Sequence, residues 1–282
     1  MKVQLIAADS MGTRSMCTYV ETDIKILIDP SVSLAPSRYG LPPHPLEEEK
    51  LKEDWQKILK LSEKAEVMII THYHFDHFSW RHPEQFKDKI LLIKHPKQNI
   101  NRSQFGRASF FLSQIEGMPR KLEYIDGKSF DFGETKIICS KPVFHGTNNK
   151  LGYVVEVLID YKGKKFLFMS DVEGPALQDQ ASFALQHKPE VIYIDGPMTY
   201  MLGYKYAMDN FRKTVENIRK FSEFAKTIIW DHHLTRDLHY KEKIKEAVDY
   251  AKDKGCKIVS AAEFMGQKDN LLEARRKELY GK

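Results

Sequence analysis

The chain of 282 residues lacks the features that mark secreted or membrane-spanning proteins. It contains only three cysteines, Cys17, Cys139 and Cys256, which are scattered and odd in number, as expected where thiols stay reduced. No apolar run approaches the length that a membrane span requires, and the first ten residues resemble a short strand rather than an export signal. We therefore expect a cytoplasmic protein that does not enter a membrane.

Flexible Gly/Ser linkers, internal repeats and low-complexity segments are also missing. Their absence favours a single domain over residues 1–282, and the 42% hydrophobic residues can supply its core. The net charge is small, +5 from 44 basic and 39 acidic residues, which falls short of the usual signature of a nucleic-acid-binding protein. The excess still favours an anionic small molecule or a nucleic-acid-like substrate. Nothing in the sequence indicates an oligomeric state.

Predicted strands and helices alternate along the chain in two similar halves. Short apolar or alternating segments predict strands at residues 2–7, 17–21, 24–28, 67–70, 90–94, 121–125, 136–140, 153–159, 165–169, 191–194 and 227–230, whereas longer periodic segments predict helices near residues 46–62, 83–87, 208–224 and 240–254. Residues 31–45 contain four prolines and are predicted to form a loop. Strands that come first in meanders and later between helices predict two sheets packed face to face, with helices outside.

The sequence THYHFDHF follows the apolar run at residues 67–70. It places His72, His74, Asp76 and His77 within six consecutive positions. Alternate residues of an extended chain point the same way, so His72 and His74 can hold one cation, while Asp76 and His77 face another way once the chain turns. We therefore predict two adjacent metal ions. The alternative is a histidine-rich surface loop, but imidazoles at this density after an apolar strand rarely arise for packing reasons.

A site for two metal ions needs more ligands than one loop offers. Three further candidates follow predicted strands: His145 in KPVFHG, Asp171 in FLFMSDV, and either His232 or His233 in TIIWDHH. The two carboxylate oxygens of Asp171 could bridge both ions. Taken alone, His145 could be a turn residue and Asp171 a helix cap, so their positions relative to the histidine loop are what favour metal binding.

In this order, the motifs resemble those of the metallo-β-lactamase superfamily, in particular its archaeal members described as predicted metal-dependent hydrolases. The resemblance covers almost the whole chain and includes Asp29 in ILIDP. It implies a four-layer αββα sandwich of the α/β (α+β) class, with the site along one edge of the two sheets. It also implies a helical insertion at about residues 40–65 and a substrate-loop insertion at about residues 95–120.

The resemblance further implies a role for each ligand. His72, His74 and His145 would hold the first metal, and Asp76, His77 and His232 the second, with Asp171 between them. Asp29 would orient a ligating imidazole. We prefer His232 to His233 because ribonuclease members of the superfamily show a similar pattern of an apolar strand, one residue and a histidine. His233 would then face the substrate or pack in the core.

Hydrolysis is the chemistry that such a centre predicts. Two divalent ions can lower the pKa of a bridging water and polarise a phosphoryl or carbonyl oxygen. We therefore expect a metal-bridging hydroxide to attack the substrate, with Asp76 orienting it. Ligands made only of nitrogen and oxygen suit zinc, with manganese or iron as alternatives.

The substrate is less well indicated by the sequence. Asn101, Arg102 and Arg107 lie in the basic segment after residue 94 and could clasp a phosphate, although the segment could equally be an ordinary exposed loop. Asp195 in YIDGP ends a predicted strand and could donate a proton to the leaving group, with helix capping or support of another residue as the alternative. Asp76, Asp171, Asp195 and His233 are thus the candidate catalytic residues.

We favour a binuclear hydrolase of phosphoester or phosphodiester bonds. A lactonase or thioesterase is the alternative, and it would need an apolar slot beside the metals, for which Phe110, Phe111, Met198, Tyr200 and Met201 are candidates. An iron-dependent redox enzyme of the same fold, or a metal-binding scaffold without activity, is a second alternative.

Overall fold

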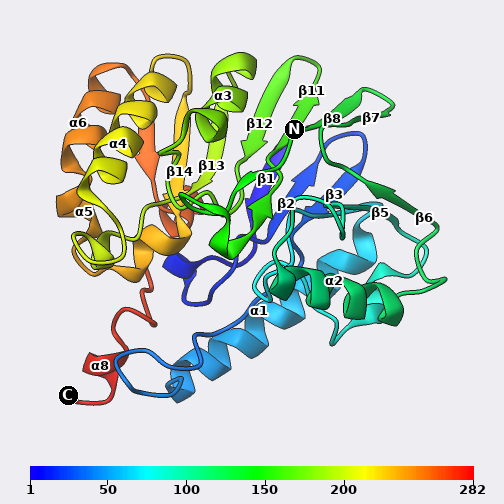
Figure 1. Cartoon of the computed structure of the whole chain (residues 1–282), viewed down its shortest axis with the longest axis horizontal. Coiled ribbons are helices and arrows are strands. Elements are labelled where there is room, and N and C mark those ends of the chain that lie inside the picture. Colours follow the sequence, from blue (N-terminus) through cyan, green and yellow to red (C-terminus); the bar gives the residue numbers. More distant parts are fainter.

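Two β-sheets pack face to face in the computed structural model, which describes residues 1–282 (Figure 1). The first sheet has the strand order β1 (Lys2–Leu5), β2 (Thr18–Glu21), β3 (Lys25–Ile28), β4 (Val67–Ile70), β5 (Ile90–Ile93) and β6 (Lys121–Tyr124). Strands β1 to β3 pair antiparallel, whereas β3 to β6 pair parallel. The parallel strands therefore end at the same edge of the sheet.

The second sheet has a similar plan. Its strand order is β7 (Ser129–Phe132), β8 (Thr135–Cys139), β11 (Val157–Tyr161), β12 (Lys164–Phe168), β13 (Val191–Asp195), β14 (Thr227–Asp231) and β15 (Lys257–Val259). Strands β7, β8, β11 and β12 pair antiparallel, and β12 to β15 pair parallel. A separate two-stranded ribbon joins β9 (Val143–Phe144) and β10 (Tyr153–Val154).

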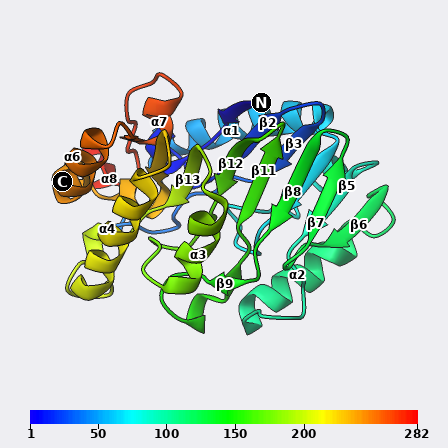
Figure 2. The same cartoon turned by 90° about the horizontal axis from the view of Figure 1, so that it is seen from above.

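Helices cover the outer face of each sheet (Figures 1 and 2). α1 (Pro45–Lys64) and α2 (Arg102–Gln114) lie on the first sheet, and α3 (Gln178–His187), α4 (Met208–Ser222) and α6 (Lys245–Asp253) lie on the second. The short helices α5 (Tyr240–Lys243), α7 (Ala261–Phe264) and α8 (Arg276–Leu279) lie near the C-terminus. The predicted αββα sandwich is confirmed. None of the helices combines the length and apolar composition needed to cross a membrane.

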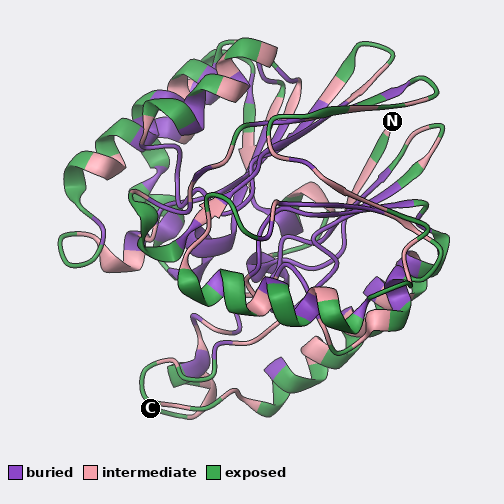
Figure 3. Ribbon diagram, turned by 45° about the vertical axis from the view of Figure 1, so that its right-hand side comes forward, coloured by how far each residue is buried: buried purple, intermediate pink, exposed green.

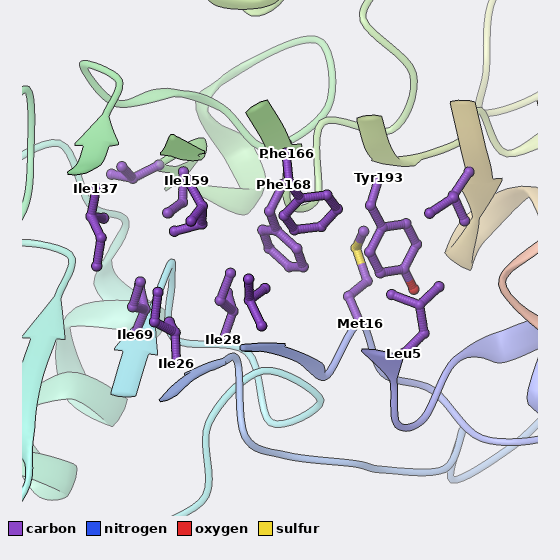
Figure 4. Packing of buried hydrophobic residues seen from close by; sticks show 14 of the residues in the cluster. Leu5, Met16, Ile26, Ile28, Ile69, Ile137, Ile159, Phe166, Phe168 and Tyr193 are labelled. Atoms are coloured by element: carbon purple, nitrogen blue, oxygen red, sulfur yellow. The ribbon is translucent and has the colours of Figure 1, made fainter. Parts of the chain in front are cut away.

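Strand residues alternate between a central core and an outer one. On β3, Ile26 and Ile28 face the other sheet, where Phe166 and Phe168 of β12 are part of the same cluster (Figure 4). Leu27 points the opposite way and packs in the cluster under α1 and α2. This period of two follows from the pleat of a strand and buries both faces of the parallel strands (Figure 3).

The prediction that residues 95–120 form a loop is wrong, because this segment contains α2. The side chain of Asn101 accepts a hydrogen bond from the Gln104 N–H at 2.8 Å and caps the first turn. Gln104, Ala108 and Phe111 are then buried on one face at helical spacing, which packs the helix onto the first sheet. The polar and exposed residues of the other face concealed this pattern in the sequence.

Other segment boundaries also differ from the predictions. The strand predicted at residues 153–159 is two strands, β10 and β11, separated by Val155 and Glu156. The helix predicted at residues 240–254 is interrupted at Ile244, between α5 and α6. The elements β7, β9, β15 and α3 were not predicted. The three strands are only two to four residues long, so they leave little period in the sequence.

Candidate metal centre

The seven predicted metal ligands converge at one edge of the two sheets. They follow β4, β9, β12 and β14, and they are His72, His74, Asp76, His77, His145, Asp171 and His232. Three of these elements contribute parallel strands whose carboxyl ends meet at this edge, so residues far apart in sequence come together.

The backbone turns sharply where the strands reach the site. Asp29, Ser170 and His232 have φ angles of 48°, 55° and 57°, in the left-handed region that non-glycine residues seldom adopt. Each lies directly after a strand or two residues beyond it. The turns aim the side chains of this edge inward instead of along the sheet.

A first group of ligand atoms comes from His72, His74, His145 and Asp171, which lie within 4.8 Å of one another. The Nε2 atoms of His72 and His145 lie 3.6 and 3.2 Å from Asp171 Oδ2. Burial, with His77 nearby, holds the pKa of His72 well below its usual value; burial, with His145 nearby, lowers the pKa of His74 to about 3. These imidazoles are therefore neutral and can donate lone pairs.

A second group comes from Asp76, His77 and His232, again within 4.8 Å. His232 Nε2 lies 3.7 Å from Asp76 Oδ2 and 3.4 Å from Asp171 Oδ2. The other oxygen of Asp171, Oδ1, lies 3.0 Å from His77 Nε2. The carboxylate of Asp171 thus contacts both groups.

The donor set fits bound cations. His72 Nε2, His77 Nε2 and Asp171 Oδ1 are buried and have no hydrogen-bond partner, which is costly for polar atoms. His77 Nδ1 contacts Asp29 Oδ2 at 2.8 Å, so a neutral His77 turns the lone pair of Nε2 toward Asp171 Oδ1. Two acceptors that face each other at 3.0 Å repel unless a cation or a proton lies between them. Nitrogen and oxygen donors of this kind suit zinc and similar divalent ions.

A proton can substitute for the cation at His77. Burial alone would lower the pKa of this imidazole, but the charges and hydrogen bonds of Asp171 and Asp29 outweigh burial and raise it to about 10. The surroundings of His77 therefore stabilise a positive charge at Nε2, either a proton or a metal ion. Asp29 lies where the predicted orienting role requires, and it also accepts from the backbone and hydroxyl of Thr71, at 2.8 and 2.7 Å.

Three supporting residues were missed in the sequence. Asp9 Oδ2 contacts His232 Nδ1 at 2.7 Å, and its other oxygen accepts from Nε of the buried Arg236 at 2.6 Å. Glu173 Oε1 lies 3.5 Å from His145 Nδ1. The available signals were weak: Asp9 follows a predicted strand as Asp29 does, and Arg236 follows His232 by one helical turn.

Asp195, the candidate proton donor, is hydrogen-bonded to His233. Its side chain is fully buried and contacts His233 Nδ1 at 3.0 and 2.9 Å, while accepting from the backbone N–H of Glu173 and His233. His233 has a ring nitrogen within 4.8 Å of ligand atoms of Asp171 and His232. Asp195 therefore holds His233, and His233 faces the centre beside His232.

The three predicted substrate contacts fall in different environments. Asn101 is the cap of α2 and donates to the Lys150 carbonyl at 2.8 Å, and Arg102 is exposed at the first position of the helix. Arg107 donates to the carbonyl of Tyr73 at 3.3 Å and lies over the ring of Phe75, 4.5 Å from its centroid. Of the three, only Arg107 contacts residues 71–78, the metal-binding loop that carries four of the candidate ligands.

Two of the residues proposed for an apolar slot, Phe110 and Phe111, lie in different environments. Phe111 is fully buried and packs against Phe78 and Phe86, so it belongs to the core. Phe110 is 48% exposed and packs on Trp80, with ring centroids 5.4 Å apart. These two positions therefore do not form one slot.

No protein-family model matches the chain. The chain is 49% identical over 282 residues to the UPF0282 protein of Korarchaeum cryptofilum, and the match covers 99% of this chain and 94% of that one. It is 39% identical over 295 residues to the UPF0282 protein MK0213 of Methanopyrus kandleri, with 100% and 99% covered.

Solved structures share the fold at low identity. Tm1679, a metal-dependent hydrolase of the β-lactamase superfamily, is 11% identical with a TM-score of 0.50, over 92% of this chain and 94% of that one. Unliganded yeast PDE1 is 13% identical with a TM-score of 0.54, over 92% and 96%. Zn²⁺-bound PqqB from Methylobacterium extorquens is 10% identical with a TM-score of 0.52, over 92% and 98%. The predicted metallo-β-lactamase fold is confirmed.

Proposed function

The chain belongs to the UPF0282 family and, from the geometry of its metal centre, we propose that it is a metal-dependent hydrolase of phosphoester or phosphodiester bonds. One observation carries this proposal: the carboxylate of Asp171 lies between two groups of histidine and aspartate ligands and contacts both. A centre with two divalent ions is the arrangement that this geometry favours.

The ligands divide between two ions in the proposed centre. His72, His74 and His145 would hold the first, and Asp76, His77 and His232 the second, with Asp171 shared. Zinc suits these donors best, and manganese or iron are the alternatives. Bound divalent ions supply Lewis acidity and lower the pKa of water, so that water can act as a nucleophile at neutral pH.

Two side chains are placed to handle protons. Asp76 keeps 15% of its side chain exposed, and we assign it to orient the attacking water. The buried Asp195 holds Nδ1 of His233, so the other nitrogen of the neutral ring carries a lone pair, which can accept the proton that the attacking water releases and pass it to the leaving group. In this assignment Asp195 is a positioning residue that fixes the orientation and tautomer of His233.

Positive charge beside the centre favours an anionic substrate. Arg107 lies against the metal-binding loop, and Arg236 lies buried with Nη2 3.9 Å from Asp76 Oδ2. Guanidinium groups match the oxygens of a phosphoester.

A lactone or thioester is the second candidate substrate. It is favoured by a groove beside the metal-binding loop whose lining includes Trp55, Phe75, Phe78 and Trp80. Phe75 lies between His74 and Asp76 in the sequence, so the groove borders the loop that carries the ligands. An apolar acyl group would suit aromatic walls better than a phosphate would.

The proposal is tested with zinc-loaded and manganese-loaded protein. Bis-p-nitrophenyl phosphate, a lactone and a thioester would be supplied in parallel, with the metal content measured in each preparation. We expect hydrolysis of the phosphodiester, and loss of both bound metal and turnover in H72A and D171A. H239A is the matched control, because His239 is 69% exposed and its nearest charged contact is Glu242.

Three outcomes would contradict parts of this assignment. Full turnover by metal-free D171A would exclude the metal-dependent mechanism. Turnover of only the lactone or the thioester would favour the second candidate. Bound iron with oxygen-dependent activity would replace hydrolysis by a redox reaction.

A further inference from the structure

A buried arginine lies beside the second group of ligands. The side chain of Arg236 is 5% exposed, and its Nη2 lies 3.1 Å from His232 Nε2, the nitrogen that faces Asp76 and Asp171. Its Nε donates to Asp9 Oδ1 at 2.6 Å. Arginine has no acceptor atom and keeps its charge, so this is a permanent cation at the centre.

The contact occupies the lone pair that a metal ion would use. His232 Nδ1 lies 2.7 Å from Asp9 Oδ2, so this nitrogen carries the proton in a neutral imidazole. In that form Nε2 has the lone pair that a metal ion would use, and Arg236 Nη2 lies 3.1 Å from it. A second ion bound to His232 Nε2 must therefore displace the guanidinium contact and stay close to a fixed positive charge.

The first group has no comparable competitor. His72 Nε2 is buried without a hydrogen-bond partner, and His74 Nε2 contacts the neutral amide of Gln104 at 3.5 Å. Neither contact adds charge or requires a strong hydrogen bond to be broken. The two positions thus differ in what a metal ion must displace.

Arg236 is also anchored where it lies. Arg236 is the last residue of the short 3-10 helix His232–Arg236, so its backbone is tied to that of His232. Arg38 donates from Nη2 to the Arg236 carbonyl at 2.9 Å, and Asp9 holds the guanidinium from the other end. The cation cannot leave the second position without breaking a buried ion pair.

We propose that Arg236 makes the two metal positions unequal, so that the first position fills before the second and the second holds its ion more weakly. The inference rests on the proposed metal centre and deepens it, because occupancy of the second position then depends on metal supply. Its physical basis is competition for His232 Nε2 together with repulsion between the guanidinium and the second ion.

Zinc titration of the metal-free protein tests this inference. Calorimetry, or competition with a chromogenic chelator, should resolve two sites, the second about 10- to 100-fold weaker than the first. In R236M, which keeps the apolar stem and removes the charge, the second affinity should rise by about tenfold or more while the first stays the same. R236K keeps the charge but lacks the planar guanidinium. The affinity of its second position should lie between those of the wild type and R236M.

The matched control is R107M. Arg107 is also close to the metal-binding loop, but it contacts the Tyr73 carbonyl and the ring of Phe75 rather than a ligand nitrogen. Its zinc isotherm should therefore match that of the wild type.

Two results would overturn the inference. One is a wild-type isotherm with two equal sites; the other is weaker binding of the second ion in R236M, which would make Arg236 a support for His232 instead of a competitor. If circular dichroism shows that R236M does not fold, the wild-type and R236K isotherms decide. Unequal zinc binding without hydrolysis would reject only the proposed activity, whereas hydrolysis with two equal sites would reject only the role of Arg236.

Discussion

At the scale of single residues, carboxylates determine which nitrogen of each histidine is available. Asp29 holds Nδ1 of His77, Asp9 holds Nδ1 of His232, and Asp195 holds Nδ1 of His233, at 2.8, 2.7 and 2.9 Å. Each contact fixes a tautomer and leaves Nε2 to face the centre. The orientation of the three imidazoles is thus held by carboxylates of the protein itself.

The assignment of His233 as proton donor predicts a dependence on the leaving group. In H233A, hydrolysis of an alkyl phosphodiester should slow by about 10²- to 10⁴-fold, because an alkoxide needs a proton to depart. Hydrolysis of the p-nitrophenyl ester should slow much less, since p-nitrophenolate leaves without protonation. Steady-state rates on the two substrates check this. Equal losses on both would indicate a structural role for His233.

A buried lysine predicts a pH dependence of stability. Lys94 follows β5, its side chain is fully buried, and its Nζ donates to the Gln98 carbonyl at 2.9 Å. Burial lowers its pKa from 10.5 to about 8, against the opposing charge of Asp126. Between these values the unfolded chain holds a proton that the folded protein has lost, so raising the pH favours the folded state by up to about 3 kcal/mol.

The comparison with K94M isolates this contribution. The free energy of unfolding would be measured in urea from pH 7 to pH 10 for both proteins. The value for the wild type minus that for K94M should increase as the pH rises above 8. A difference that stays constant, or that falls with pH, would contradict the assignment.

At the scale of elements, the ends of strands and one helix build the site. All candidate ligands except His145 follow parallel strands, whose carboxyl ends share an edge, and left-handed backbone at Asp29, Ser170 and His232 turns the chain there. α2 supports the metal-binding loop from outside: Gln104 accepts from the Tyr73 N–H at 3.3 Å and donates to the Leu151 carbonyl at 2.7 Å. The helix therefore links the loop to the segment after His145.

Loss of the α2 cap should therefore destabilise the protein. In N101A the Gln104 N–H loses its acceptor and the Lys150 carbonyl loses its donor, and we expect a loss of about 1 kcal/mol in the free energy of unfolding. Urea unfolding measures this. S103A is the control, because Ser103 is the exposed second residue of the helix. Its free energy of unfolding should stay within about 0.5 kcal/mol of the wild type. Equal stability of N101A and S103A would show that the cap is unimportant.

At the scale of the whole molecule, the C-terminal segment is fastened to the N-terminal half. Arg276 and Glu47 form a fully buried pair with two contacts of 2.7 Å, and Arg14 pairs with Glu273 at 2.6 Å. The backbone N–H of Asn270 donates to the Ser10 carbonyl at 2.7 Å. Ser10 lies next to Asp9, the residue that contacts His232 Nδ1. The C-terminal segment therefore packs against the backbone that positions Asp9.

The buried pair predicts a large effect from a single substitution. R276M leaves the Glu47 carboxylate buried without its partner, so the free energy of unfolding should fall by about 3–5 kcal/mol. R275M is the matched control, because the neighbouring Arg275 pairs with Glu278 at the surface and should contribute at most about 1 kcal/mol. Denaturant unfolding of both variants checks the prediction, and similar losses would contradict it.

Periodicity in the sequence predicted the sandwich and most of its longer elements. It did not predict α2, because only Gln104, Ala108 and Phe111 of that helix are buried. It also missed β9 and β15, which are too short to show a pattern. For such elements, contacts with the rest of the fold outweigh local preference.

The candidate metal ligands could be identified from the sequence alone, because their residue types, spacing and positions after apolar strands are local properties. The tertiary structure alone decided what surrounds them. Asp9 and His232 are 223 residues apart, and no local pattern pairs them. The roles of Asp195 and Arg236 likewise depend on which strand ends the folded sheets bring together. Pairing across such distances depends on the packing of the whole chain, whereas the chemistry of each ligand is already present in its side chain.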